Sequence, residues 1–426
     1  MGRLLLATSN LENLHRAARD VCGRVRHTAW QHLKSELDAF ELLPIRRLRR
    51  IQKQLREGTY RFSAKWGYAK RKSGGSRRGI TVHNLNDRIV QRSLLNTIRS
   101  QKAELQARLG EIPRLLQTST SFAGIPGRGV PEAIRLAYQS IRAGALAYAY
   151  SDMKDFFPCV PRHDVVELLR TNIDDTQFVD LFTAALETEI ANRAEIETWS
   201  ALFPLSEVGV AQGSLLSTLV GNLALRHFDA RLNRPPLTTV RYLDDFLILA
   251  ADLNLVAVGF AGAVEELAAL GMTCYQPHDG SQKAALGLAA DGFDFLGCHV
   301  HPDGVSPARR ARRKLLRDIA LALASAKRAI RQFQKTDERR RAEVAYSQTL
   351  VHIDKKVRGW GDAYRFVSNR VAFSQMDVEI DGMLNDFQQW FRRNERQTTD
   401  PRVRRRMRGI SLLADTPPAD GLSQTP

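Results

Sequence analysis

Hydrophobic and polar positions divide the first hundred residues into helical stretches around one β-hairpin. Residues 10–57 carry apolar side chains at helical spacing among many charges, and Gly58 ends the pattern. Residues 64–80 hold a Gly-Gly pair between two short segments that are rich in Lys and Arg, which predicts a hairpin with a basic surface. Residues 87–98 return to the helical period.

Short apolar runs in the middle of the chain predict strands. The run at 145–150 predicts a strand that ends at Ser151-Asp152. Runs at 238–242 and 246–250 flank Leu243-Asp244-Asp245 and form the clearest hairpin pattern of the chain. Helices are expected between and after these strands, at 164–190, 218–231 and 253–270. A further hairpin is expected at 293–300 with Gly304.

Beyond residue 305 the pattern becomes helical. One face collects apolar residues such as Leu315 and Ile319, and Arg and Lys occupy the other face. Two more helices are expected at 337–358 and 376–395. The Pro-rich stretch 411–426 is typical of a disordered tail.

Charge is distributed unevenly along the chain. The net charge is +17, made of +15 over residues 1–100, −9 over 101–300, +13 over 301–410 and −2 beyond. Most of the basic groups are Arg, whose forked guanidinium suits phosphate oxygens. We therefore expect a polyanion at the two basic segments and cations at the acidic one. The alternative is that Arg reflects codon bias and only gives a soluble surface.

The cysteines and the apolar segments point to a soluble, cytoplasmic protein. The four cysteines lie far apart without metal-ligand spacing, which predicts buried thiols in a reducing compartment. Acidic and amide side chains interrupt the most apolar stretch, 246–270, so we expect no membrane span.

Three acidic residues at strand ends are the strongest candidates for chemistry. Asp152 follows one predicted strand, and Asp244 and Asp245 lie at the turn of the predicted hairpin. If the strands are neighbours, the carboxylates cluster and suit Mg²⁺, which prefers oxygen ligands. Two such ions activate a hydroxyl nucleophile and stabilise a pyrophosphate leaving group. A glycine-flanked loop at 209–217 precedes a helix and can approach a nucleotide closely.

In this order the three segments resemble the palm motifs of reverse transcriptases. The match rests on Ser151-Asp152-Met153-Lys154-Asp155-Phe156-Phe157-Pro158, on Gln212-Gly213-Ser214 and on Tyr242-Leu243-Asp244-Asp245. Further similar segments are Ser121–Val130, with its Pro-Gly-Arg-Gly, the helix Asn86–Arg92, and Phe293–Gly297, which is similar to the primer-grip motif. The likeness covers residues 60–305.

The resemblance implies an α+β right-hand polymerase, with fingers and palm built from an antiparallel sheet plus helices and with an α-helical thumb. The expected domains are an N-terminal helical extension at 1–60, fingers at 61–145, a palm at 146–305, a helical thumb at 306–410 and the tail at 411–426.

The resemblance also implies roles for individual residues. Asp152, Asp244 and Asp245 would be catalytic and, with the Met153 carbonyl, would hold two Mg²⁺ ions, with Mn²⁺ as a substitute. The primer grip would include Phe295, Leu296 and Gly297. The dNTP would be bound by Lys72, Arg77, Arg78, Asp155, Phe156, Phe157, Gln212, Gly213 and Lys283.

Three of these assignments have plain structural alternatives. Phe157 would be the aromatic gate that excludes a ribose 2′-OH, or else a core aromatic, with Phe156 beside it facing the other side of a strand. Lys283 would protonate the leaving pyrophosphate, or else be a surface lysine. One of Arg77 and Arg78 would grip the triphosphate while the other is solvated.

The chain departs from the family pattern at two positions. Ala211 replaces the usual proline before Gln-Gly, and Leu243 replaces a frequent alanine. The stretch Gly359–Tyr364 is similar to the thumb of group-II-intron-like enzymes, and the compact chain most resembles the stand-alone, defence-associated (unknown-group) bacterial reverse transcriptases.

The resemblance implies copying of RNA into DNA, by attack of a primer 3′-OH on the α-phosphate of a dNTP. The implied partners are a template RNA, which we expect to be a dedicated non-coding RNA in antiphage defence, a DNA primer or product, and dNTPs. The alternatives are a group II intron maturase, a catalytically silent RNA-binding scaffold, and a polymerase of ribonucleotides.

Overall fold

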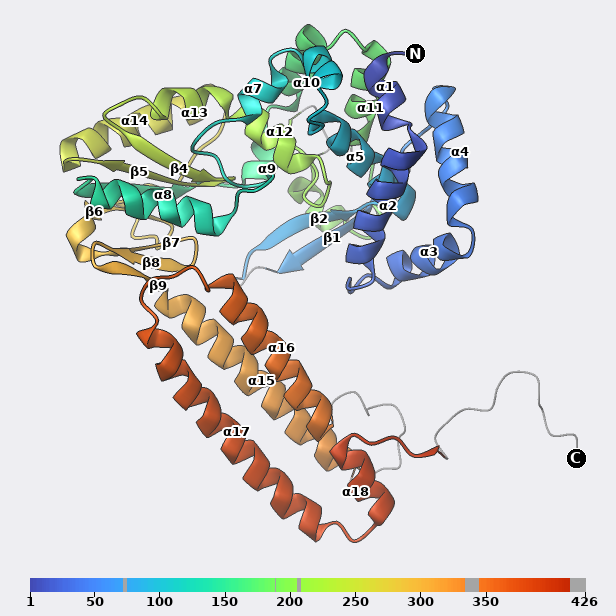
Figure 1. Ribbon diagram of the computed structural model, residues 1–426, viewed down its shortest axis with the longest axis vertical. Coiled ribbons are helices and arrows are strands. Elements are labelled where there is room, and N and C mark those ends of the chain that lie inside the picture. The colour runs from blue at the N-terminus through green and yellow to red at the C-terminus, as the bar shows by residue number, and fades with distance from the viewer. Residues whose placement is uncertain (72–74, 188, 205–207, 334–344, 414–426) are drawn as a thin grey trace, which may run out of the picture. The chain divides into compact units, whose positions relative to one another are not determined.

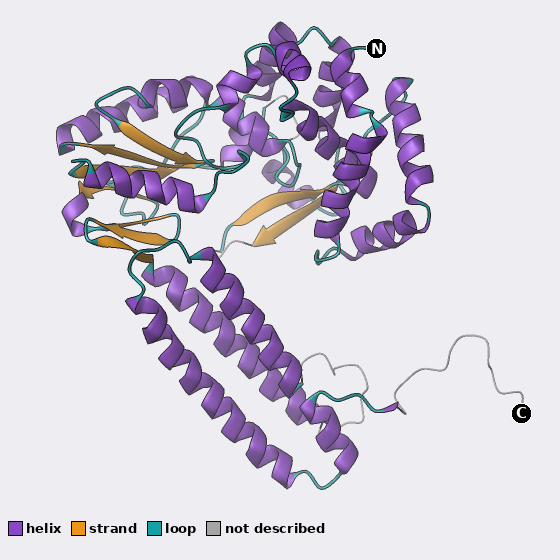
Figure 2. Ribbon diagram, viewed as in Figure 1, coloured by secondary structure: helices purple, strands orange, loops and turns teal. Residues whose placement is uncertain are grey.

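The computed structural model describes the chain except for residues 72–74, 188, 205–207, 334–344 and 414–426 (Figure 1). The described residues form two compact units, Met1–Leu288 and Ala289–Pro426. Figure 2 shows that both units combine helices with strands, so the fold is a mixed α+β fold. All strand pairs within the sheets are antiparallel, as the sequence predicts.

The first unit contains most of the helices. Its helices are α1 (Arg3–Thr8), α2 (Leu11–Val25), α3 (Gln31–Leu42), α4 (Pro44–Arg56), α5 (Leu85–Ile98), α6 (Ala103–Gln106), η1 (Ala107–Leu109), α7 (Ile112–Leu116), α8 (Val130–Arg142), α9 (Phe156–Cys159), α10 (Arg162–Asn172), α11 (Thr176–Leu186), η2 (Glu197–Leu202), α12 (Ser217–Ala224), α13 (Arg226–Leu232) and α14 (Leu253–Ala269).

Two sheets accompany these helices. A two-stranded hairpin and a four-stranded sheet of order β4-β5-β3-β6 are formed by β1 (Trp66–Arg71), β2 (Arg77–Val82), β3 (Ala147–Asp152), β4 (Thr238–Tyr242), β5 (Asp245–Ala250) and β6 (Ala284–Leu288). Strand β5 carries an unbroken apolar run and is buried from Phe246 onward, as a central strand covered on both faces requires. Helix α14 packs against β3, β5 and β6, and α8 packs against β4 and β5.

The long helical pattern at 10–57 is three helices rather than one. Helix α2 ends at Val25, and the next break falls between Leu42 and Pro44. Pro44 has no N–H to offer the preceding turn, so it starts α4 at the first helical position. The predicted helix at 164–190 is likewise divided, into α10 and α11, and the one at 218–231 into α12 and α13.

The second unit is a small sheet followed by long helices. Its elements are η3 (Ala289–Asp291), β7 (Phe293–Phe295), β8 (Cys298–His301), β9 (Gly304–Pro307), α15 (Arg309–Phe333), α16 (Tyr346–Ala363), α17 (Val371–Gln397) and α18 (Pro401–Arg408). Helix α15 packs against α16, α17 and α18 around one apolar core. Parts of two predictions, the helix start at 337–344 and the tail at 414–426, lie outside the described residues.

Across the described residues, no helix combines the length and apolar character that a membrane crossing requires.

Candidate active site

The sheet brings the acidic residues of the first and third motifs together. Strand β3 pairs with β5, and Asp152 lies directly opposite Asp245 in the register. The Met153 N–H donates to the Asp244 carbonyl at 3.0 Å, which extends the pairing past the strand end. Side chains of directly opposite residues lie on the same face of a sheet. The three predicted acidic residues therefore lie at the same end of the two central strands, although Asp244 and Asp245 are 92 and 93 positions after Asp152 in the chain.

Burial and nearby negative charge raise the proton affinity of Asp244 and Asp245. Burial raises the pKa of Asp245 to about 7, and the charges of Asp244 and Asp152 add to the increase. Burial, followed by repulsion from Asp152, also raises the pKa of Asp244. Both effects disfavour the ionised forms, so the cluster stabilises any cation that enters it.

The donor set fits magnesium by its chemistry. Clustered carboxylates with raised pKa values present hard oxygen ligands in need of positive charge. Among the described residues, no three His, Cys, Asp or Glu side chains are already gathered as closely as a metal site requires. One carboxylate is instead engaged by a cation of the chain itself, since Lys283 Nζ pairs with Asp152 Oδ2.

Lys283 is held beside Asp152 by the backbone and by Tyr275. The Asp152 N–H donates to the Lys283 carbonyl at 3.1 Å, and the Tyr275 N–H donates to the Asp152 carbonyl at 3.1 Å. The Lys283 ammonium lies 4.5 Å from the centre of the Tyr275 ring. Burial lowers the pKa of Lys283, but its hydrogen bond and attraction to Asp152 outweigh burial and raise it. Sequence reasoning missed Tyr275, because nothing in its spacing marks it.

The Gln212 loop is attached to the hairpin β1–β2 and to α5. The Thr81 N–H donates to the Gln212 carbonyl at 2.9 Å, and the Leu215 N–H donates to Gln91 Oε1 at 3.3 Å. Gly213 has φ +132°, and a Cβ there would collide with the Thr81 carbonyl oxygen. Only glycine fits this position, so the loop lies close against β2. The Gln212 side chain is half-buried and Gly213 is exposed.

The segment after Asp152 is attached to the same loop. The Val210 N–H donates to the Phe157 carbonyl at 2.8 Å, and the Gly209 N–H donates to the Val160 carbonyl at 2.7 Å. The first motif therefore contacts the second through its backbone and the third through the sheet. All three motifs thus meet in the first unit.

Phe156 and Phe157 differ in burial, but not for the reason that sequence reasoning offered. They do not lie on a strand, since Asp155 has φ +45° and the short helix α9 begins at Phe156. Phe156 is buried and packs against Gly221 of α12, whereas Phe157 is only partly buried. Asp155 is exposed. Phe157 is thus the more accessible of the two rings.

The two hairpin arginines have different surroundings. Arg77 donates to the Ala69 carbonyl at 3.0 Å, and its guanidinium lies 4.5 Å from the Trp199 ring centre. Arg78 is the next residue of β2 and is exposed. Successive strand residues face opposite sides, so only one of the two can face a given ligand. Lys72 lies outside the described residues.

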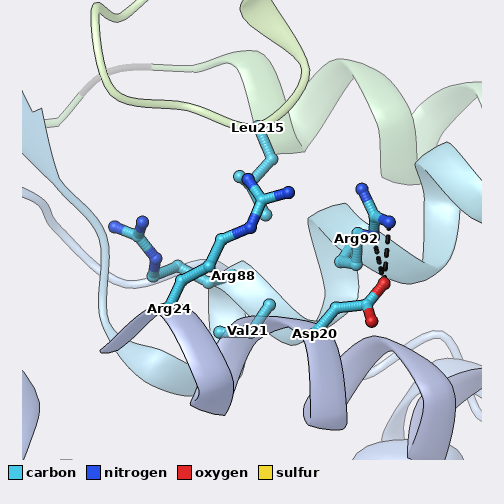
Figure 3. A pocket seen from close by; sticks show the side chains of 6 residues that line it. All are labelled: Asp20, Val21, Arg24, Arg88, Arg92 and Leu215. Atoms are coloured by element: carbon cyan, nitrogen blue, oxygen red, sulfur yellow. Dashed lines mark hydrogen bonds and ion pairs between the residues drawn. The ribbon is translucent and has the colours of Figure 1, made fainter. Parts of the chain in front are cut away.

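Figure 3 shows a second group of arginines beside the Gln212 loop. Arg24, Arg88 and Arg92 line this pocket with Asp20, Val21 and Leu215. Arg92 forms an ion pair with Asp20 at 2.7 Å. Burial, and then the Arg24 charge, lower the pKa of Arg88, whose Nε is buried without a partner among the described residues. The pocket therefore adds uncompensated positive charge next to the loop.

A buried ion pair supports the carboxylate turn and was not anticipated from the sequence. Arg241 and Asp229 are fully buried, and Arg241 Nε and Nη2 donate to the two Asp229 oxygens at 2.6 Å each. Arg241 Nη1 donates to the Leu243 carbonyl at 3.0 Å and to Asn222 Oδ1 at 3.1 Å. Leu243 has φ +63°, a strained conformation for a side chain of its kind. Arg241 thus holds the carbonyl of a strained residue that precedes Asp244.

The predicted primer-grip residues lie in the second unit. Phe295 is buried, and Leu296 and Gly297 form a two-residue turn between β7 and β8. Both turn residues have positive φ, +49° and +80°, as the hairpin twist favours. The Ala308 N–H donates to the Gly297 carbonyl at 2.9 Å.

Comparison with known sequences finds distant relatives. No protein-family model matches the chain. The chain is 25% identical over 158 residues to an uncharacterized 91 kDa protein in cob intron of Schizosaccharomyces pombe, which covers 37% of this chain and 17% of that protein. It is 23% identical over 271 residues to protein YkfC of Escherichia coli K12, which covers 53% of this chain and 64% of that protein. The chain is thus distantly similar to a protein encoded in an intron and to YkfC. It spans less than two thirds of the length of each relative.

The solved structures that resemble the chain have low sequence identity and low TM-scores. Apo telomerase from Candida tropicalis, truncated from its C-terminal domain, is 12% identical with a TM-score of 0.38, over 58% of this chain and 55% of that one. A chain of a partial Cas6-RT-Cas1–Cas2 complex is 19% identical with a TM-score of 0.34, over 62% and 41%.

Proposed function

We propose that the chain is an RNA-directed DNA polymerase that transfers nucleotides from dNTPs to a primer 3′-OH. The observation that carries the proposal is the register of β3 and β5, which sets Asp152 opposite Asp245 at a strand end. A structural core has no use for a group of acidic residues at one strand end, because the charges of Asp244 and Asp152 destabilise the ionised form of Asp245. Nucleotidyl transfer needs such a cluster.

The chain's own residues supply the remaining parts of the reaction. Phosphate oxygens would be bound by Arg78 and Lys283, whose charges are exposed or half-exposed. The Gln212 loop would support the incoming nucleotide, and Phe157 would contact the sugar. Asp152, Asp244 and Asp245 would hold Mg²⁺, which when bound lowers the pKa of an attacking hydroxyl and neutralises the leaving pyrophosphate. Lys283 would leave Asp152 and hold a proton for the leaving group.

Nucleotide incorporation tests the proposal directly. We would compare the wild type, Asp244→Ala/Asp245→Ala and the control Glu265→Ala/Glu266→Ala on a primed RNA template with dNTPs and Mg²⁺. The control removes the same charge from Glu265, which is exposed, and Glu266, which is partly exposed, on α14. We expect the Asp variant to lose at least about a hundredfold in rate and the control to stay within about twofold. Equal rates in all three proteins, or no incorporation by any, would refute the polymerase.

The template and the biological role extend the proposal. We propose a dedicated non-coding RNA as template and antiphage defence as the role, on the resemblance to stand-alone defence enzymes. Sequencing the RNA and DNA that co-purify with the protein tests both, with one recurrent short RNA and complementary DNA as the expected result. A group II intron maturase is the alternative, which the relative in the cob intron favours. Intron RNA in the same experiment would support that alternative.

A further inference from the structure

The first unit contains a second basic site, in a cavity at its N-terminal helices. The cavity has a volume of about 560 Å³ and is lined by α4, the segment 60–63 and the start of α5. Four arginines and three amide side chains line it: Arg46, Arg47, Arg50, Arg61, Gln54, Asn84 and Asn86. The cavity is large enough for part of a ligand rather than for water alone.

The sequence of α4 explains why the arginines collect there. Leu48, Ile51 and Leu55 recur at helical spacing and are buried. At 100° per residue, Arg46, Arg47 and Arg50 fall on a second face about 100° wide, and Arg49, Lys53 and Arg56 fall on a third, which adjoins the second where Lys53 lies next to Arg46. The arginines of the second face line the cavity together with Ile51 and Gln54, and none of the third-face residues does. Helix α4 contains no acidic residue that could neutralise it.

The carboxylate that lines the cavity is already engaged. Asp87 is buried, and its two oxygens accept hydrogen bonds from Tyr60 Oη at 2.7 Å and from the Ser63 N–H at 2.9 Å. Within the described part of the chain, no acidic group lies at ion-pair distance from Arg46, Arg47 or Arg50, which are exposed. The cavity therefore presents a concentrated positive charge to solvent.

The chemistry of the lining favours a phosphodiester backbone over a single base or a small anion. Arg46 and Arg50 lie one helical turn apart, about 5–6 Å, so they can bind successive phosphates of one strand. Tyr60, the aromatic ring in the lining, is buried with its hydroxyl engaged, so it gives no platform for stacking a base. Gln54 and Asn86 carry amides, which can both donate to and accept from a ribose 2′-OH.

The cavity, called the α4 groove from here on, is separate from Asp152, Asp244 and Asp245. None of its lining residues belongs to β3, β4 or β5. Figure 1 shows α4 and the strands β3–β5 at opposite sides of the first unit. We propose that the α4 groove binds the phosphodiester backbone of RNA outside the catalytic site and anchors the template-bearing molecule. The identity of that RNA as a template rests on the proposed function, whereas the binding itself does not.

The test compares two faces of the same helix. Arg46→Gln/Arg47→Gln/Arg50→Gln changes the groove, and Arg49→Gln/Lys53→Gln/Arg56→Gln removes the same charge from the third face. Both are made in the Asp244→Ala/Asp245→Ala protein. Binding of a labelled single-stranded RNA of mixed sequence is measured by fluorescence anisotropy over a range of salt concentrations, with DNA of the same sequence as competitor.

We expect the groove variant to lose about 10- to 100-fold in affinity near physiological salt and the control less than about threefold. The slope of log affinity against log salt should become less steep by about 2 in the groove variant, since about 0.7 is lost per single-strand phosphate contact. Hydrogen exchange of the wild-type protein should show protection of residues 44–63 when RNA is added. These results are independent of nucleotide incorporation, so failure of the polymerase would leave them unchanged.

Two results would overturn the inference. Equal losses in the groove and control variants, without protection of residues 44–63, would show that α4 adds only diffuse charge. Equal competition by RNA and DNA would reject RNA as the ligand. Circular dichroism checks that both variants fold, which we expect because all six substituted side chains are exposed.

Discussion

Removing Asp229 should destabilise the first unit strongly and locally, because Arg241 would remain buried without its counterion. Arg241 has no solvent exposure, and its side chain makes two of its four hydrogen bonds to Asp229. Truncating one partner of such a buried pair costs about 3–5 kcal/mol. Asp229→Ala should therefore lower the free energy of unfolding by about this amount.

Exposed ion pairs of the same unit provide the control. Arg231 pairs with Glu265 at 2.6 Å and with Glu266 at 3.0 Å, but these side chains remain in solvent. Glu265→Ala should cost less than about 1 kcal/mol. Hydrogen exchange of the β5 amides measures both effects, because β5 pairs with β4, which carries Arg241. This measurement reports the stability of the sheet without assuming that both units unfold together.

A third variant separates the buried charge from the packing around it. Asp229→Leu/Arg241→Met replaces the pair with apolar side chains of similar size, which is often neutral or stabilising. We expect it to recover most of the stability lost in Asp229→Ala, but not the hydrogen bond to the Leu243 carbonyl. Nucleotide incorporation should therefore remain low in both variants. If Asp229→Ala costs no more than Glu265→Ala, the reasoning about the buried pair is wrong.

Other predictions concern single residues of the site. Asp245→Asn should raise the free energy of unfolding at pH 8 in metal-free buffer by about 2–4 kcal/mol. This gain should shrink from pH 7 towards pH 4, because the native wild-type protein binds a proton at Asp245 over that range. A gain in urea titrations that stays constant with pH would contradict the raised pKa. Phe157→Ala should increase incorporation of rNTPs with little loss of stability, whereas Phe156→Ala should cost about 3–5 kcal/mol; unchanged dNTP/rNTP selectivity in Phe157→Ala would reject the gate. Tyr275→Leu should lower kcat about three- to tenfold, because an aromatic ring over the ammonium stabilises the position of Lys283 by about 1 kcal/mol. Tyr275→Phe keeps the ring and should keep kcat. An equal loss of kcat in both variants would show that the Tyr275 hydroxyl, and not the ring, supports Lys283.

The sequence predicts elements well where one physical rule dominates. The hairpin β4–β5 follows from apolar runs on either side of a turn, and the pairing of Asp152 with Asp245 follows if the strands are neighbours. The antiparallel sheet is therefore confirmed. The ends of helices are harder to predict from the sequence, because the division of residues 10–57 into three helices depends on Pro44 and on packing among α2, α3 and α4.

The supports of the site could not be predicted from the sequence. Asp229 is one of many acidic residues, and only the fold of α13 against β4 brings it to Arg241. Tyr275 reaches Lys283 through an extended segment that pairs with Met153 and Asp152. In both cases the partners come from different elements, and neither hydrophobic period nor residue spacing records which elements meet.

The negative charges at the turn bear on the buried ion pair that supports it, Arg241 with Asp229. Ionised Asp244 and Asp245 repel each other and Asp152, which opposes a compact turn. Burial and then the Asp152 charge raise the pKa of Asp244, and the charge of the buried Arg241 offsets only part of this increase. A desolvated guanidinium requires an acceptor of opposite charge, which Asp229 supplies. The buried pair thus holds the carbonyl of the strained Leu243 and offsets part of the repulsion at the turn.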